Sequence, residues 1–151
     1  MKKLQQLGLA LALAAGTIGA VGGALTAEDV VEYRQSMMIG LAWNIGAIGT
    51  MVKGEAPWNQ KTVASLATRA AVLAPMAREG FTPDTAKAKS HAKAELWDNL
   101  KDFDERNEVM VKATAKLAQV AAGTDEEATR AAFMDTVKTC KGCHEKYQEK
   151  E

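Results

Sequence analysis

The stretch Cys140-Lys141-Gly142-Cys143-His144 places two thiols and an imidazole in one pentapeptide close to the C-terminus. This C-x-x-C-H pattern is the attachment signature of a c-type haem. The two thiols add across the vinyl groups of the porphyrin to form thioethers, and the adjacent neutral imidazole binds the iron from one face. Residues three and four apart share one face of a helix, so Cys140, Cys143 and His144 can address one planar ligand. The motif predicts one covalent haem c per chain, with His144 as the iron ligand.

Two other kinds of site use cysteines at this spacing. A thioredoxin-like redox dithiol requires a βαβ context, and no strand-like run flanks the motif. A zinc site needs about four ligands, but the chain has no further cysteine and its other histidine, His91, belongs to no ligand pair. The redox dithiol and a chance occurrence remain the alternatives to haem.

The N-terminal residues have the features of a targeting segment. Met1-Lys2-Lys3 gives a positive start, residues 7–13 form an apolar centre, and Gly and Ala crowd the residues that follow. This order predicts a signal peptide at residues 1–24 that is cleaved, followed by one mature domain at residues 25–151. An uncleaved membrane anchor is the alternative.

The net charge of the mature chain excludes one class of partner. Cleavage removes two lysines and no acid, which leaves 17 basic and 19 acidic residues and a net charge of −2 before the haem propionates are counted. A slightly negative net charge does not attract the phosphate backbone of a nucleic acid. Bacterial haem c is attached outside the cytoplasm, so the targeting segment and the haem motif agree, and together they predict a periplasmic protein.

The mature region predicts an all-α fold. It is rich in Ala, Leu, Met, Lys and Glu, has three prolines, and shows few β-branched alternations. These are the preferences of helices. Four helical segments are expected, over about Thr26 to Lys53, Asn59 to the region of Pro75, Ser90 to Ala122, and from a capping box at Thr124 to Glu127 onward.

The first helix carries an inward stripe that steps by three and four residues, as bundle helices do. Arg34 is the anomaly on it: either it snorkels from the bundle end or it meets a buried anion such as a haem propionate. Gly40, Gly46 and Gly49 also lie in this helix, which suggests close approach by the haem or by a second subunit, unless a long packed helix simply tolerates them. The stripe is Val31, Arg34, Met38, Leu41, Ile45, Ile48 and Val52.

The later helices continue this pattern. Pro75 should kink or end the second helix. Asn107 and Thr114 are polar breaks on the stripe of the third helix, where a backbone hydrogen bond to residue i−4 is the simplest explanation. His91, near the predicted start of that helix, is expected to be a solvated surface residue.

The fourth helix has the most informative stripe, because the haem motif lies on it. Cys140 and His144 share the stripe with core residues, so the haem is expected between helices with His144 inside the bundle. The stripe is Phe133, Val137, Cys140, His144 and Tyr147.

The mature chain resembles the cytochrome c′ family over essentially its whole length. A C-x-x-C-H motif near the C-terminus is typical of this family, whereas most other c-type cytochromes carry it near the N-terminus. The segments that match are residues 31–38 (VEYRQSMM), residues 53–57 (KGEAP) and residues 140–147 (CKGCHEKY).

The resemblance implies an antiparallel four-helix bundle, usually a homodimer built on the first two helices. It implies that Cys140 and Cys143 attach the haem and that His144 is the proximal ligand. It also places Arg34 and Gln35 at the haem propionates. One departure is Gln148, where many members have a basic residue beside the proximal histidine.

The resemblance places Met38 on the distal side of the haem, where its role decides the mechanism. In high-spin members the distal residue packs over a five-coordinate iron, which then takes only small uncharged diatomics such as NO or CO. In low-spin relatives a methionine of this helix ligates the iron, and the six-coordinate His–Met centre transfers electrons. Met37 lies about 100° round the helix, so Met38 is the preferred residue for either role.

The leading prediction is therefore a periplasmic haem c protein that transfers electrons to redox partner proteins, binds NO or CO at a five-coordinate iron, or does both. The low-spin His–Met electron carrier is the alternative. A haem peroxidase is a weaker one, because no distal histidine or acid lies near Met38 on its helix to assist O–O cleavage. The chain is therefore not expected to be an enzyme.

Overall fold

The computed structural model describes residues 24–150, and four long helices make up most of them. They are α1 (Ala27–Val52), α2 (Gln60–Glu79), α4 (Leu100–Ala121) and α5 (Glu126–Tyr147). The short helices η1 (Pro83–Lys87) and α3 (Glu95–Asp98) lie in the connection between α2 and α4. The predicted signal peptide lies outside the described residues, apart from Ala24.

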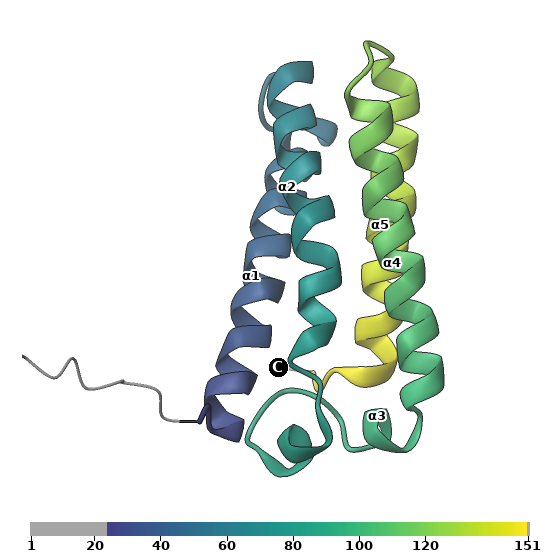
Figure 1. The fold of residues 1–151 in the computed structure, drawn as a ribbon. Coiled ribbons are helices and arrows are strands. Elements are labelled where there is room, and N and C mark those ends of the chain that lie inside the picture. The colour runs from purple at the N-terminus through teal and green to yellow at the C-terminus, as the bar shows by residue number, and fades with distance from the viewer. Residues whose placement is uncertain (1–23, 151) are drawn as a thin grey trace, which may run out of the picture.

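The helices are arranged as two hairpins. Figure 1 shows α1 beside α2 and α4 beside α5, with the connection from α2 to α4 looping across the lower end of the bundle. The predicted all-α four-helix bundle is confirmed. No helix among residues 24–150 is both long and apolar enough to cross a membrane.

Side-chain caps start the first two helices where the sequence predicts. The Thr26 hydroxyl accepts a hydrogen bond from the Asp29 amide (3.1 Å), and the Asp29 carboxylate accepts one from the Thr26 amide (2.8 Å). Asn59 caps α2 by accepting from the Thr62 amide at 2.8 Å. These bonds satisfy backbone donors that have no partner inside the helix.

The start of α5 differs from the prediction by one residue. The N-cap is Asp125, whose carboxylate accepts from the Ala128 amide at 2.9 Å. The capping box predicted on Thr124 and Glu127 was therefore wrong. Asp is as good an N-cap as Ser or Asn and better than Thr, so Asp125 caps the helix in place of Thr124.

Two apolar clusters lie between the long helices. The first joins all four long helices, and the second joins α1 to α2. Several of the predicted inward positions on these helices, such as Leu41, Ile48 and Phe133, are buried in them. The fully buried or nearly buried members are Leu41, Ile48, Met51, Val63, Leu66, Ala67, Ala70, Ala74, Ala77, Leu117, Ala121 and Phe133.

Two predicted helix boundaries were wrong. Pro75 does not end α2, which continues four residues to Glu79, and the alternative of a kink at Pro75 stays a prediction. The predicted third helix from Ser90 is absent until Glu95, and Asn99 then separates α3 from α4.

The glycines of α1 fit against neighbouring helices. A Cβ at Gly40 would lie 3.1 Å from Leu73 of α2, and one at Gly49 would lie 3.4 Å from Phe133 of α5. The close neighbours of these two glycines within the chain are therefore core side chains, which agrees with tolerance of the glycines in a packed helix. A Cβ at Gly46 would meet nothing within 4 Å.

Candidate haem site

A cavity of about 470 Å³ lies at the end of the bundle that the α2–α4 connection crosses. Its volume is within the roughly 300–1,000 Å³ usual for small-molecule sites. Helix α1 lines one side, the end of α5 lines another, and residues 81–103 complete it. The lining residues are Arg34, Gln35, Met38, Ile39, Ala42, Phe81, Ser90, His91, Ala92, Leu96, Phe103, Cys143, His144, Tyr147 and Gln148.

A smaller, mostly apolar cavity of about 150 Å³ adjoins the first and shares Met38, Cys143 and His144 with it. It extends the space along α5 to Cys140. The two cavities together therefore bring both cysteines and the histidine of the motif to one space that α1 also lines.

The motif lies in the last two turns of α5. Cys140 and Cys143 are half-buried free thiols, and burial raises the pKa of both. A reactive redox dithiol needs the opposite shift, usually at a helix N-terminus or beside a cation. The helical context and the raised pKa values therefore disfavour the redox-dithiol interpretation.

His144 lines both cavities but is an exposed residue. Its exposed surface belongs to the wall of the two cavities, and its burial against the haem stays a prediction. Partial desolvation by the surrounding residues lowers the pKa of the imidazole. A lowered pKa favours the neutral imidazole, the form that binds a metal ion.

The two adjacent methionines of α1 differ in their surroundings. Met38 lines both cavities. Met37 lines neither and packs against the cluster around Leu41 and Ala70. The structure thus brings Met38 to the same space as His144, which agrees with the choice of Met38 from the sequence.

Arg34 is buried, with 2% of its surface exposed. Its guanidinium donates to the Gly80 carbonyl (2.9 Å), the Thr85 hydroxyl (2.7 Å) and the Ser90 hydroxyl (2.9 Å). It also lies 4.4 Å from the centre of the Phe81 ring, a cation–π contact. Snorkelling from the bundle end was therefore the wrong interpretation.

Among residues 24–150, no carboxylate forms a salt bridge with Arg34. Burial lowers the pKa of its guanidinium, the direction expected for a desolvated cation. Gly80 permits this arrangement, because a Cβ there would lie 2.6 Å from the Arg34 Cβ. A buried cation with neutral partners at a cavity wall is suited to an anionic group of a ligand.

The rim of the cavity is closed by pairing between two irregular segments. The Lys93 amide donates to the Tyr147 carbonyl (2.9 Å), and the Glu149 amide donates to the His91 carbonyl (2.8 Å). His91 is exposed, as predicted, but it also lies on the cavity rim. Its place there depends on this pairing, which has no signature in the local sequence.

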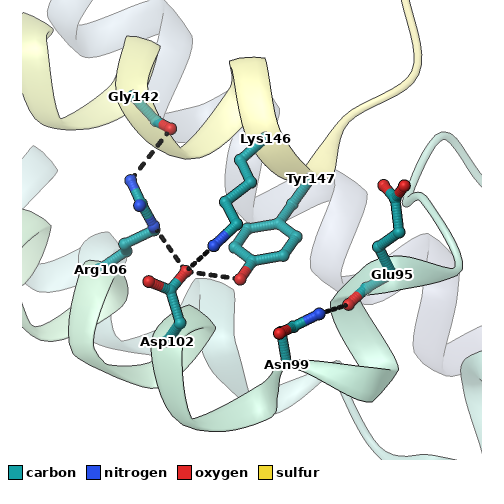
Figure 2. A network of polar contacts seen from close by, with 7 residues as sticks. All are labelled: Glu95, Asn99, Asp102, Arg106, Gly142, Lys146 and Tyr147. Atoms are coloured by element: carbon teal, nitrogen blue, oxygen red, sulfur yellow. Dashed lines mark hydrogen bonds and ion pairs between the residues drawn. The ribbon is translucent and has the colours of Figure 1, made fainter.

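Sequence reasoning also missed a polar network on α4 beside the motif (Figure 2). The Asp102 carboxylate accepts from Arg106 (2.7 Å), Lys146 (2.9 Å) and Tyr147 (2.5 Å) through one oxygen, Oδ2. Arg106 donates in addition to the Gly142 carbonyl at 3.3 Å. The i,i+4 spacing of Asp102 and Arg106 was a readable signal, but the contacts to α5 were not.

This network predicts a pH-dependent difference in stability between the wild type and Asp102→Asn. The hydrogen bonds from Arg106, then Tyr147 and Lys146, hold the pKa of Asp102 well below its ordinary value of 3.8. A lowered folded-state pKa stabilises the fold above the unfolded-state pKa, and the gain is lost as pH falls below it. The wild type should therefore have the higher urea midpoint above about pH 5, and the difference should shrink towards zero with acid.

Urea unfolding of both proteins at several pH values measures this difference. Glu126→Gln is the matched control, because Glu126 is exposed and pairs with Arg130 at the other end of α5. A difference between wild type and Asp102→Asn that is independent of pH would contradict the prediction.

The residues around the two cavities fit a covalent haem c. Two thiols and an imidazole lie on one wall, a thioether lies on the wall from α1, and a buried cation lies at the first cavity. The remaining lining is largely apolar, as a porphyrin requires. Each chemical group of haem c thus has a suitable partner in this chain.

Comparison with known proteins agrees with this fit. The family model described as Cytochrome C′ matches residues 29–148. The cytochrome c′ of Allochromatium vinosum is 35% identical over 150 residues, which cover 94% of this chain and 92% of that protein.

Solved structures give the same result. Cytochrome c prime from Shewanella frigidimarina superposes with a TM-score of 0.80 at 33% identity, over 82% of this chain and 97% of that one. A nitric oxide complex of a mutant cytochrome c prime from Alcaligenes xylosoxidans has a TM-score of 0.77 at 29% identity, over 83% and 98% of the chains. By its fold, its attachment motif and these relatives, the chain belongs to the cytochrome c′ family and carries covalently attached haem c.

Proposed function

We propose that this protein holds a five-coordinate haem iron, binds NO or CO there, and exchanges electrons with redox partner proteins. The haem supplies an iron that changes oxidation state and takes a diatomic ligand. Cys140 and Cys143 form the thioethers, and His144 is the proximal ligand. The observation that carries the proposal is the packing of Met38 against two apolar clusters, at the cavity wall from α1, while His144 lines the same cavities from α5.

Met38 determines which ligands reach the iron. Its side chain packs against apolar residues of two clusters, those around Leu41 and Phe103. A thioether held in this way excludes water and charged ligands, and a small uncharged diatomic displaces it at modest cost. The nitric oxide complex of the Alcaligenes xylosoxidans relative supports gas binding at such a site.

Arg34 and Gln35 are proposed to contact the haem propionates. Arg34 has five N–H donors. Three of them, two on one terminal nitrogen and one on the other, donate to neutral groups. Donors are therefore left for a carboxylate, and a buried guanidinium gains most from an anionic partner. Gln35 follows Arg34 on α1 and lines the same cavity.

Absorption spectra of the ferric and ferrous protein test the proposal. Broad high-spin bands that change on addition of CO are expected for a five-coordinate iron. A charge-transfer band of a His–Met centre in the red would contradict it. That result would favour the six-coordinate electron carrier, for which the position of Met38 on the cavity wall is equally suitable.

A peroxidase-like activity is disfavoured because the residues of α1 that line the larger cavity with Met38 include no His, Asp or Glu, and His91 lies on the cavity rim instead. Cleavage of an O–O bond in peroxide needs a positioned acid or base on the distal side. We therefore propose that the protein is not an enzyme. Rapid turnover of peroxide by the purified protein would overturn this assignment.

We propose that the protein works in the periplasm, after cleavage of a signal peptide at residues 1–24 leaves a mature domain at residues 25–151. Attachment of haem c outside the cytoplasm requires such export. Mass spectrometry of the haem-containing protein, fractionated from cells, measures both the compartment and the mature N-terminus.

A homodimer through α1 and α2 is the proposed assembly. Ile39 and Trp43 on α1 are 69% and 76% exposed, and Gly46 follows on the same face without a neighbour. Val72 on α2 is 59% exposed. Exposed large apolar side chains next to a glycine are suited to close packing against a second helix.

Trp43→Glu is therefore expected to convert the dimer to a monomer, because it places a charge in a desolvated contact. Light scattering of the haem-containing protein measures the change. Val109→Glu on α4 is the matched control, since Val109 is 54% exposed on a helix outside the proposed interface. A dimer that survives Trp43→Glu would exclude this face as the interface.

A further inference from the structure

The turn of α5 that carries Cys143 and His144 is bonded to α4 at both of its ends (Figure 2). At one end the Gly142 carbonyl accepts from Arg106 at 3.3 Å. At the other end Lys146 and Tyr147 donate to Asp102, at 2.9 Å and 2.5 Å. The two attachments are about 6 Å apart along the helix axis, since four residues separate Gly142 from Lys146.

One ion pair connects these attachments. The Arg106 Nε donates to Asp102 Oδ2 at 2.7 Å while another nitrogen of the same guanidinium reaches Gly142. Guanidinium is planar and rigid, so it fixes the distance and direction between its two acceptors. Asp102 and Arg106 thus form a single brace between the first turns of α4 and the last turns of α5.

The aromatic part of the contact is buried. Tyr147 is 3% exposed, and its ring packs edge-on against Phe103 at a centroid distance of 5.7 Å. Both rings also line the larger cavity. Because the Tyr147 hydroxyl is bonded to Asp102, a change in this network moves a side chain that contacts the haem space.

We propose that Asp102 and Arg106 are positioning residues for the haem-attachment turn. They fix the rotation of residues 142–147 about the α5 axis, and through it the orientation of the His144 imidazole at the iron. This inference rests on the proposed role of His144 as proximal ligand, and it adds two residues of α4 to the site.

Two replacements in the haem-containing protein test the brace. Asp102→Asn keeps an oxygen acceptor but removes the charge. Arg106→Lys keeps the charge but cannot reach Asp102 and Gly142 together. Both should shift the hyperfine-shifted proton resonances of the His144 ring, and both should accelerate amide exchange at residues 142–148 by about tenfold, as loss of a charge-assisted hydrogen bond implies.

The chain offers a matched control at the other end of α5. Arg130 pairs with Glu126 and donates to the Val52 carbonyl at 2.8 Å, which repeats the geometry of Arg106 away from the haem. Glu126→Gln and Arg130→Lys should leave the His144 resonances unchanged. If Asp102 and Arg106 act as one brace, the double variant should shift these resonances no further than the larger single effect.

The outcomes distinguish failure of the positioning role of Asp102 and Arg106 from failure of the proposed function. If amide exchange rises but the His144 resonances stay in place, the brace is an ordinary stabilising contact and the inference is overturned. If the wild type shows no hyperfine-shifted imidazole, His144 is not the ligand and the proposed function itself fails. Should Asp102→Asn not accumulate as folded protein, Arg106→Lys decides the question alone.

Discussion

Replacing both Cys140 and Cys143 with Ser is expected to abolish retention of haem after denaturation. The wild type should carry its haem through a denaturing gel, because thioethers survive unfolding, whereas an axial bond to His144 does not. Each single variant keeps one thioether and should still stain for haem. Mass spectrometry measures the same change, as loss of the haem mass from the double variant alone.

The single variants also serve as controls for folding and expression. Both thiols are half-buried in the same helix, so a Ser at either position disturbs packing to a similar extent. Retention of haem by the double variant would show that another side chain makes the covalent link. Absence of covalent haem from the wild type would refute the attachment role of the motif.

The helices were predictable because their signals are local. Ile48, Leu117 and Phe133 lie on stripes with the period of a helix, and all three are buried in the cluster that joins the long helices. The caps Thr26 and Asn59 likewise act within three residues of their own position. Periodicity and capping depend on the nearest turn, so the sequence carries them.

The α2–α4 connection was not predictable for the opposite reason. The apolar spacing of Leu96, Leu100 and Phe103 continues across the break at Asn99, so the pattern indicates one helix. Residues 91–93 are instead held by backbone bonds to residues 147–149, which are more than fifty positions away. Pairing at that distance follows from the packed bundle and leaves no periodic pattern.

The site divides in the same way. The C-x-x-C-H motif by itself indicates haem attachment, and the helical period of α1 places Met38 on the inward stripe. The partners of Arg34 could not be predicted from the sequence. They are Gly80, Thr85 and Ser90, which only the folded connection brings to α1. The sequence identified Arg34 as anomalous, and the structure supplies neutral acceptors that hold it at the cavity.

Met38→Ala is expected to accelerate CO binding to the ferrous protein by about ten- to hundredfold. If the thioether packs over the iron, CO must displace it. Removal of that step lowers the barrier by roughly 1.4–2.8 kcal/mol, each 1.36 kcal/mol being tenfold in rate. Flash photolysis or stopped-flow mixing with CO measures the rate, and the absorption spectrum should stay high-spin.

Met37→Ala is the matched control, because it removes the same side chain from the adjacent residue of α1. Met37 packs on the α1–α2 cluster and lines neither cavity, so its loss should affect stability and leave the CO rate within about twofold, since the barrier at the iron is unchanged. If Met38→Ala instead converts a low-spin spectrum to a high-spin one, the thioether was a ligand and the protein is the six-coordinate electron carrier. If it changes neither the rate nor the spectrum, Met38 does not lie over the iron, and the distal residue must be sought among the other residues of α1 that line the cavity.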